Sequence, residues 1–155
     1  MTATVHDFDP NYDLKQRLET VRAERQKLAD EREAREQERA LADLVEQEER
    51  SLRNERAIAE AEAAHGALGK KIAAVEARSG VVIVKRPHHV LFRKFTDASK
   101  FTSDECEKLV RPSLVYPDKA TFDSWAEEEP AIIVRAANAC AMLAGVRGEE
   151  ASGKS

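Results

Sequence analysis

No residue that breaks a helix occurs between Asn11 and Ala64. All six glycines and four of the five prolines follow this stretch, which consists mainly of the better helix formers Ala, Glu, Arg, Leu and Gln. Opposite charges recur at helical spacing, as in Glu31 and Arg35, and each such pair stabilises a helix by roughly 0.2–0.5 kcal/mol. We therefore expect one long charged helix over residues 11–65, preceded by a flexible N-terminus over residues 1–10.

The apolar residues of this helix do not sustain a coiled-coil repeat. Heptad positions counted from Leu14 are apolar for two heptads, and most later ones are Arg or Glu. A coiled coil needs roughly three to four intact heptads. We expect a largely solvated helix or a partly disordered arm that pairs with itself at most weakly, with a specific oligomerisation coiled coil as the alternative. Self-association would use Leu14, Leu18, Val21, Leu28, Leu41, Leu44 and Leu52.

The second half of the chain has the composition of a small folded domain. Six of the eight aromatic residues lie within residues 80–146, which we expect to form a small helical domain. Val81–Val84, four β-branched residues after a glycine, is the one clear strand signal. Two glycines within residues 66–79 predict a hinge and a short helix, and residues 147–155 a disordered tail. The predicted fold is mainly α, with a long charged N-terminal helix, a small helical domain and one short strand-like segment.

Local signals place the helix ends of this domain. Thr102 followed three residues later by Glu105 is a capping box, which predicts a helix start. Pro112 ends or kinks that helix, and Leu114–Tyr116 is expected to be an extended link. Gly145 is expected to close the last helix.

The sequence contains no arrangement typical of an enzyme or a metal site. The two cysteines, Cys106 and Cys140, cannot form a metal framework, and Cys106 is expected to be buried and unreactive. On a helix, the neighbours His88 and His89 point about 100° apart and cannot both face one metal. We expect a protein that is not an enzyme and uses no cofactor or metal.

Charge and hydropathy narrow the classes of partner. The chain has 25 basic and 29 acidic residues, and its arginines are interleaved with glutamates, so it lacks the basic surface that grips nucleic acid. No apolar run approaches the roughly 18 residues that suggest a membrane span. We expect a cytoplasmic protein with reduced thiols that binds neither nucleic acid nor membrane, and that forms a homo-oligomer or binds another protein.

The clustered aromatic and aliphatic residues of the second half have two interpretations, and both can hold in part. They form the core of the domain, or a domain this small leaves some of them exposed as an apolar patch that binds a protein. The predicted partner-binding residues are Leu91, Phe92, Phe95, Phe122, Trp125, Ile132 and Ile133.

The region from Gly80 to Gly145 resembles the small tail assembly proteins of long-tailed bacteriophages, in particular the tail assembly chaperones. The resemblance rests on spaced apolar residues and prolines in Val81–Pro87, Phe92–Phe95, Leu109–Arg111, Val115–Pro117, Phe122, Pro130 and Leu143–Gly145. It implies a mostly helical protein of the host cytoplasm. Such a protein keeps the apolar helices of the tape measure protein in solution while tail-tube subunits polymerise. The alternative is a structural or scaffolding coiled-coil protein that oligomerises through the N-terminal helix and stays in the virion.

Overall fold

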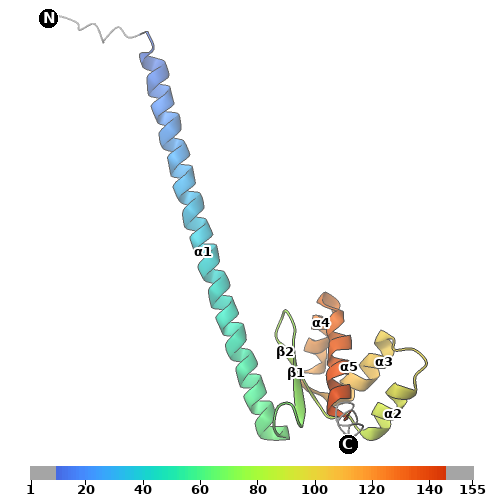
Figure 1. Cartoon of the computed structure of the whole chain (residues 1–155). Coiled ribbons are helices and arrows are strands. Elements are labelled where there is room, and N and C mark those ends of the chain that lie inside the picture. Colours follow the sequence, from blue (N-terminus) through green and yellow to red (C-terminus); the bar gives the residue numbers. More distant parts are fainter. Residues whose placement is uncertain (1–9, 146–155) are drawn as a thin grey trace, which may run out of the picture. The chain divides into compact units, whose positions relative to one another are not determined.

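The computed structural model describes residues 10–145 and is mainly helical, as predicted (Figure 1). The expectations for residues 1–9 and 147–155 lie outside the described residues. The sheet has three strands, where the sequence predicted only one strand-like segment. In chain order the elements are α1 (Tyr12–His65), β1 (Ile72–Glu76), β2 (Val81–Lys85), α2 (His89–Asp97), α3 (Ser103–Ser113), β3 (Leu114–Tyr116), α4 (Lys119–Glu128) and α5 (Ala131–Leu143).

The chain divides into two compact units, one ending at Gln47 and the other beginning at Glu48. The boundary falls inside α1. In the first unit, every residue from Tyr12 to Gln47 is exposed, so this part of the helix has no core of its own. The second unit contains the last turns of α1 and the strand β1, and therefore begins well before the predicted domain boundary at residue 80.

The sheet is antiparallel with the strand order β1-β2-β3. The expectation of a short helix within residues 66–79 is wrong, because the strand β1 lies in that segment. Ile72 pairs with Lys85 and Glu76 with Val81. The alanines of this segment favour a helix locally. Pairing with β2 and the burial of Ile72 stabilise the strand instead. Gly66 has a φ of 108°, a left-handed conformation that ends α1 and that glycine adopts readily.

The β-branched run in β2 is buried on both faces of the sheet. Val82 and Val84 lie in a core cluster with residues of α3, α4 and α5. Val81 and Ile83 lie in a second cluster with Ala57 and Ala61 of α1. The second unit is therefore layered, with the C-terminal turns of α1 on one face of the sheet and α3 and α5 on the other (Figure 1).

The helix ends follow their local signals. The Oγ1 atom of Thr102 accepts a hydrogen bond from the Glu105 backbone N–H at 3.3 Å, as the capping box predicted. Pro112 lies inside the last turn of α3, which ends one residue later. Gly145 follows α5 with a φ of 106°, consistent with its predicted role as the closing residue.

Candidate protein-binding site

The predicted partner-binding residues separate into core and surface. Phe122, Ile132 and Ile133 are 1%, 0% and 7% exposed and belong to the main core cluster. They cannot contact a partner in this conformation, so their assignment to a binding patch is wrong. Helical spacing identified an apolar stripe but not which of its residues face the sheet and the neighbouring helices.

Trp125 is half-buried and is held by the hairpin between β1 and β2. A β-carbon at Gly80 would lie 2.7 Å from Cη2 of Trp125, so glycine is the residue that permits this approach. The ring of Tyr116 meets Trp125 edge-on, with centroids 6.5 Å apart. These contacts indicate that Trp125 mainly closes the core at this end of the sheet.

Leu91, Phe92 and Phe95 have a different position, because α2 contains no fully buried residue. All three lie on the apolar face of α2 and pack against the main core cluster while staying half-buried. Between α2 and α3 lies a cavity of about 520 Å³, which we call the α2–α3 groove. Its residues are Leu91, Lys94, Phe95, Glu105, Lys108, Leu109, Arg111 and Pro112.

The α2–α3 groove has apolar side chains on its floor and charged side chains at its rim. Lys108 forms an exposed ion pair with Glu105 at 3.4 Å. Arg111 pairs with Asp123 and, more loosely, with Glu107 at 3.8 Å. Lys94 has no ion pair with any other residue in the described range. Such a floor and rim suit the apolar face of an amphipathic helix.

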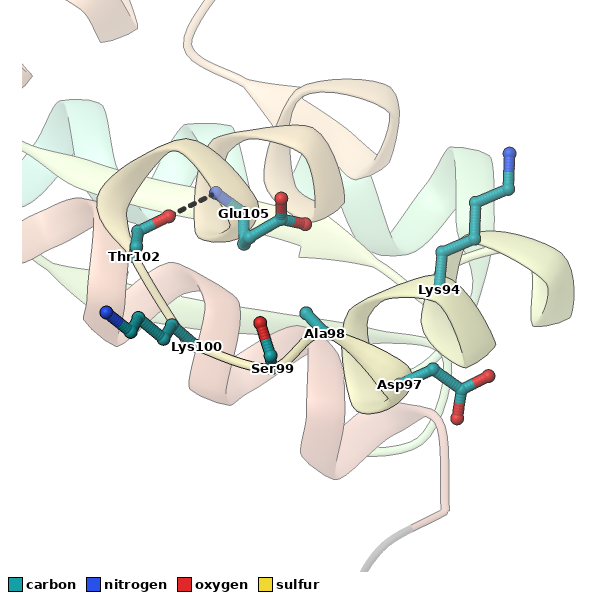
Figure 2. Close-up of a pocket in the computed structure, with 7 residues that line it drawn as sticks. All are labelled: Lys94, Asp97, Ala98, Ser99, Lys100, Thr102 and Glu105. Carbon is teal, nitrogen blue, oxygen red and sulfur yellow. Dashed lines mark hydrogen bonds between the residues drawn. The ribbon is translucent and has the colours of Figure 1, made fainter.

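A second, more polar cavity of about 570 Å³ continues from the α2–α3 groove along the loop between the two helices. Both share Lys94 and Glu105. Figure 2 shows Lys94 and Asp97 on α2, Ser99 and Lys100 on the loop, and the Thr102 cap that starts α3. The charged side chains of Asp97 and Lys100 extend the rim of the groove along this loop.

Phe101 is one of the six clustered aromatic residues of the second half, and it was not among the predicted partner-binding residues. It is 65% exposed, and its ring lies 5.1 Å from that of Phe95, between centroids. A large exposed aromatic side chain beside an apolar groove is typical of a protein-binding surface. Its position directly before the capping box, between α2 and α3, is the sequence feature that indicates its exposure.

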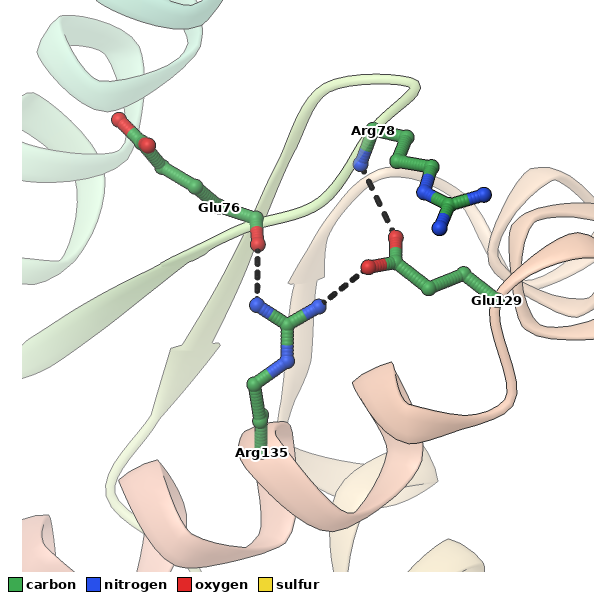
Figure 3. A network of polar contacts seen from close by, with 4 residues as sticks. All are labelled: Glu76, Arg78, Glu129 and Arg135. Carbon is green, nitrogen blue, oxygen red and sulfur yellow. Dashed lines mark hydrogen bonds and ion pairs between the residues drawn. The ribbon is translucent and has the colours of Figure 1, made fainter.

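The acidic run at residues 127–129 is not simply a solvated helix end. Glu129 accepts hydrogen bonds from the Arg135 guanidinium at 2.6 Å and from the Arg78 backbone N–H at 3.0 Å. Arg135 also donates to the backbone oxygen of Glu76 at 2.7 Å. Figure 3 shows these contacts, which fasten the junction of α4 and α5 to the hairpin. Glu129 is therefore a structural residue.

The residues predicted for self-association all lie on α1 and are exposed. Leu14, Leu18, Val21 and Leu28 lie on one narrow face of the helix. At 100° per residue, Leu41 and Leu52 lie about 180° around the helix from that face. A pair of helices cannot bury both sets in one interface. The exposed fractions are Leu14 59%, Leu18 48%, Val21 49%, Leu28 58%, Leu41 63%, Leu44 59% and Leu52 47%.

Neither of the two cysteines has the lowered pKa of an activated nucleophile. Burial raises the pKa of Cys140 to about 12, although a hydrogen bond with Ser113 opposes the shift. Burial, followed by the nearby Glu105, also raises the pKa of Cys106, which is buried as expected. His88 accepts a hydrogen bond from the Val90 backbone N–H and so caps α2. Within residues 10–145, no three His, Cys, Asp or Glu side chains gather closely enough to hold a metal ion.

Comparison with known proteins adds no relative. No family model matches the sequence, and no curated protein or solved structure matches it. Among the described residues, no helix combines the length and apolar character needed to cross a bilayer.

Proposed function

We propose that this chain is a non-enzymatic assembly protein that binds an apolar helix of a partner protein in the α2–α3 groove. The observation that carries the proposal is the combination of a half-buried apolar floor, a charged rim and the exposed ring of Phe101. Apolar contacts supply the affinity, and the charged rim orients the helix and keeps the complex soluble.

The resemblance of residues 80–145 to tail assembly chaperones gives this partner an identity. The proposed partner is the tape measure protein of a long-tailed phage. Its apolar helices must be shielded from water until the tail tube surrounds them. Many copies, each binding weakly, coat one long partner and are released as the tube grows. The chain acts in the cytoplasm of the host cell.

Co-expression with the tape measure protein tests this function. We expect the soluble fraction of the tape measure protein to rise with the wild-type chain. The rise should disappear with the double variant Leu91→Asp and Phe101→Asp. A matched control is the double variant Val45→Asp and Val134→Asp, which places the same two charges at exposed apolar positions on α1 and α5. Equal solubility of the partner with and without the wild-type chain would contradict the proposal.

A second candidate function is that of a structural or scaffolding protein that oligomerises through α1. Of the fourteen exposed large apolar residues in the described part of the chain, nine lie on α1. Light scattering on the full chain and on a fragment of residues 48–155 separates the two functions. A scaffold falls from oligomer to monomer when α1 is shortened, whereas a chaperone that uses the α2–α3 groove keeps its binding to the partner.

A further inference from the structure

The hydrogen bonds between β1 and β2 show which main-chain groups of β1 point outward, to the edge that has no neighbouring strand. The Arg86 N–H donates to the Lys71 oxygen at 3.3 Å, and the Ala77 N–H donates to the Gly80 oxygen at 2.8 Å. In an antiparallel pair, residues alternate between bonding to the neighbouring strand and pointing away from it. The N–H and C=O groups of Ile72, Ala74 and Glu76 therefore point away from β2.

This edge is closed at both ends and open in the middle. The Ile72 oxygen accepts a hydrogen bond from the Gly69 N–H at 2.7 Å. The Glu76 oxygen accepts one from the Arg135 guanidinium, also at 2.7 Å. Between them, the N–H and C=O of Ala74 have no hydrogen-bond partner among residues 10–145. Proteins usually protect edge strands because such groups pair readily with another strand.

The open main chain of Ala74 faces a cavity of about 460 Å³ between β1 and α5, which we call the β1–α5 groove. Small side chains on its walls, such as Ala73 and Ala139, let another main chain approach closely. Met142 is 51% exposed and adds a flexible apolar surface. The lining residues are Gly69, Ala73, Ala74, Val75, Arg135, Asn138, Ala139, Met142 and Leu143.

Unpaired positive charge lies at the Gly69 end of the β1–α5 groove. Lys70 and Lys71 follow Gly69 directly, just outside the lining of the groove, and the side chain of Lys71 lies close to Gly66. The hairpin register places Arg86 opposite Lys71. None of the three cations has an ion pair with another described residue. At the other end, Arg135 is already paired with Glu129. The charge beside the Gly69 end of the groove is therefore complementary to a segment that has carboxylates at one end only.

We propose that the β1–α5 groove binds an extended, acidic and apolar segment of a partner polypeptide by β-strand addition. The segment pairs with the N–H and C=O of Ala74. It places one apolar side chain against Val75 and Met142, and its carboxylates lie at Lys70 and Lys71. Main-chain pairing supplies affinity in this mode of recognition, and the side-chain pocket and charges supply specificity. The proposal does not depend on the α2–α3 groove.

Nuclear magnetic resonance of the ¹⁵N-labelled full chain tests the proposal directly. The probe is an acetylated and amidated octapeptide of alternating Thr and Val that ends in two Asp residues. We expect saturable binding, with the Ala74 amide protected from hydrogen exchange and the resonances of Lys70 and Lys71 shifted. The matched control peptide has two Lys in place of the two Asp and should bind at least about tenfold more weakly, which corresponds to about 1.4 kcal/mol.

Two variants separate strand addition from binding elsewhere. Ala74→Pro removes the outward N–H, which edge strands tolerate because that group does not belong to the ladder. Ala139→Phe fills the groove with a larger side chain and leaves the sequence of β1 unchanged. It therefore tests the proposal even if the proline disturbs β1. We expect each folded variant to lose at least about tenfold in affinity for the probe.

Three results would overturn the proposal. They are the absence of saturable binding at millimolar peptide, unchanged affinity in both variants, and shifts confined to the α2–α3 groove. Pairing of two copies of the chain through Ala74 in place of peptide binding would also overturn it.

Discussion

The two parts of α1 show that the size of an apolar side chain does not decide whether a helix buries it. Before Glu48 the helix carries leucines such as Leu14 and Leu28, which are more than half exposed. After Glu48 it covers the sheet with Ala57 and Ala61, which are 7% and 4% exposed. Alanine lets the helix axis approach the sheet closely, so the two buried residues of this interface are small, and the larger Ile58 packs at its edge and stays only partly buried.

Hydrogen bonds reinforce the difference between the two parts. The Asn54 side chain accepts a hydrogen bond from the Val81 N–H at 2.9 Å, and Arg50 donates to the Arg78 oxygen at 2.6 Å. Both bonds join the C-terminal part of α1 to the hairpin between β1 and β2. The part before Glu48 is stabilised by interactions within the helix itself, such as the hydrogen bond between Gln26 and Asp30.

Two truncations give the largest expected effect. We expect a fragment of residues 48–155 to melt cooperatively, with nearly the stability of the full chain. A fragment of residues 66–155 should lose about 5 kcal/mol or more, because Ile72, Val81 and Ile83 lose their cover. Urea denaturation followed by circular dichroism measures both. Equal stability of the two fragments would show that α1 contributes nothing to the core. The parts of α1 before and after Glu48 would then not differ in their role.

A charge introduced at Ala61 tests the contact between the C-terminal part of α1 and the sheet at a single residue. Ala61→Asp places an unpaired carboxylate against the sheet, and we expect a loss of about 3–5 kcal/mol. Ala59→Asp has the same effect on helix propensity at an exposed position, so it isolates the cost of burial. The free energy of unfolding from urea titration distinguishes them. Similar losses in the two variants would mean that Ala61 is not packed against the sheet.

The sequence predicted the features of the fold that local chemistry decides. The long helix follows from the absence of breakers before Gly66, the start of α3 from Thr102 and Glu105, and β2 from its four β-branched residues. The strand β1 was missed because its two central alanines favour a helix locally. Only pairing with β2, a contact between separate segments, decides its conformation.

The candidate site was predicted only in part for a similar reason. The apolar stripes of the helices were found, and Leu91 and Phe95 do line the α2–α3 groove. Spacing could not show that Phe122 and Ile132 face inward, since that depends on which helices cover the sheet. The β1–α5 groove was not predicted at all, because it depends on the register of a strand that was not expected.

The contacts of Glu129 should give a moderate effect. Glu129→Ala removes the acceptor for Arg135 and for the Arg78 backbone N–H, and we expect a loss of about 1–2 kcal/mol. The neighbouring Glu128 is exposed, so Glu128→Ala should change stability by less than about 0.5 kcal/mol. Thermal denaturation of the full chain compares the two. An equal and small effect would mean that the network in Figure 3 does not fasten α4 and α5 to the hairpin.

The smallest effect on stability is expected from the large apolar residues of the first unit. Replacing Leu14, Leu18 and Val21 together by Gln keeps helix propensity high and removes only exposed apolar surface, so the free energy of unfolding of the second unit should change by less than about 0.5 kcal/mol. Sedimentation velocity over a range of concentrations then shows whether these residues serve association. A weaker self-association in the variant would assign this face of α1 to an interface between copies, whereas unchanged sedimentation would leave α1 before Glu48 as a solvated helix. A large loss of stability would contradict the comparison itself, because it would mean that the exposed leucines support the fold as the buried alanines do.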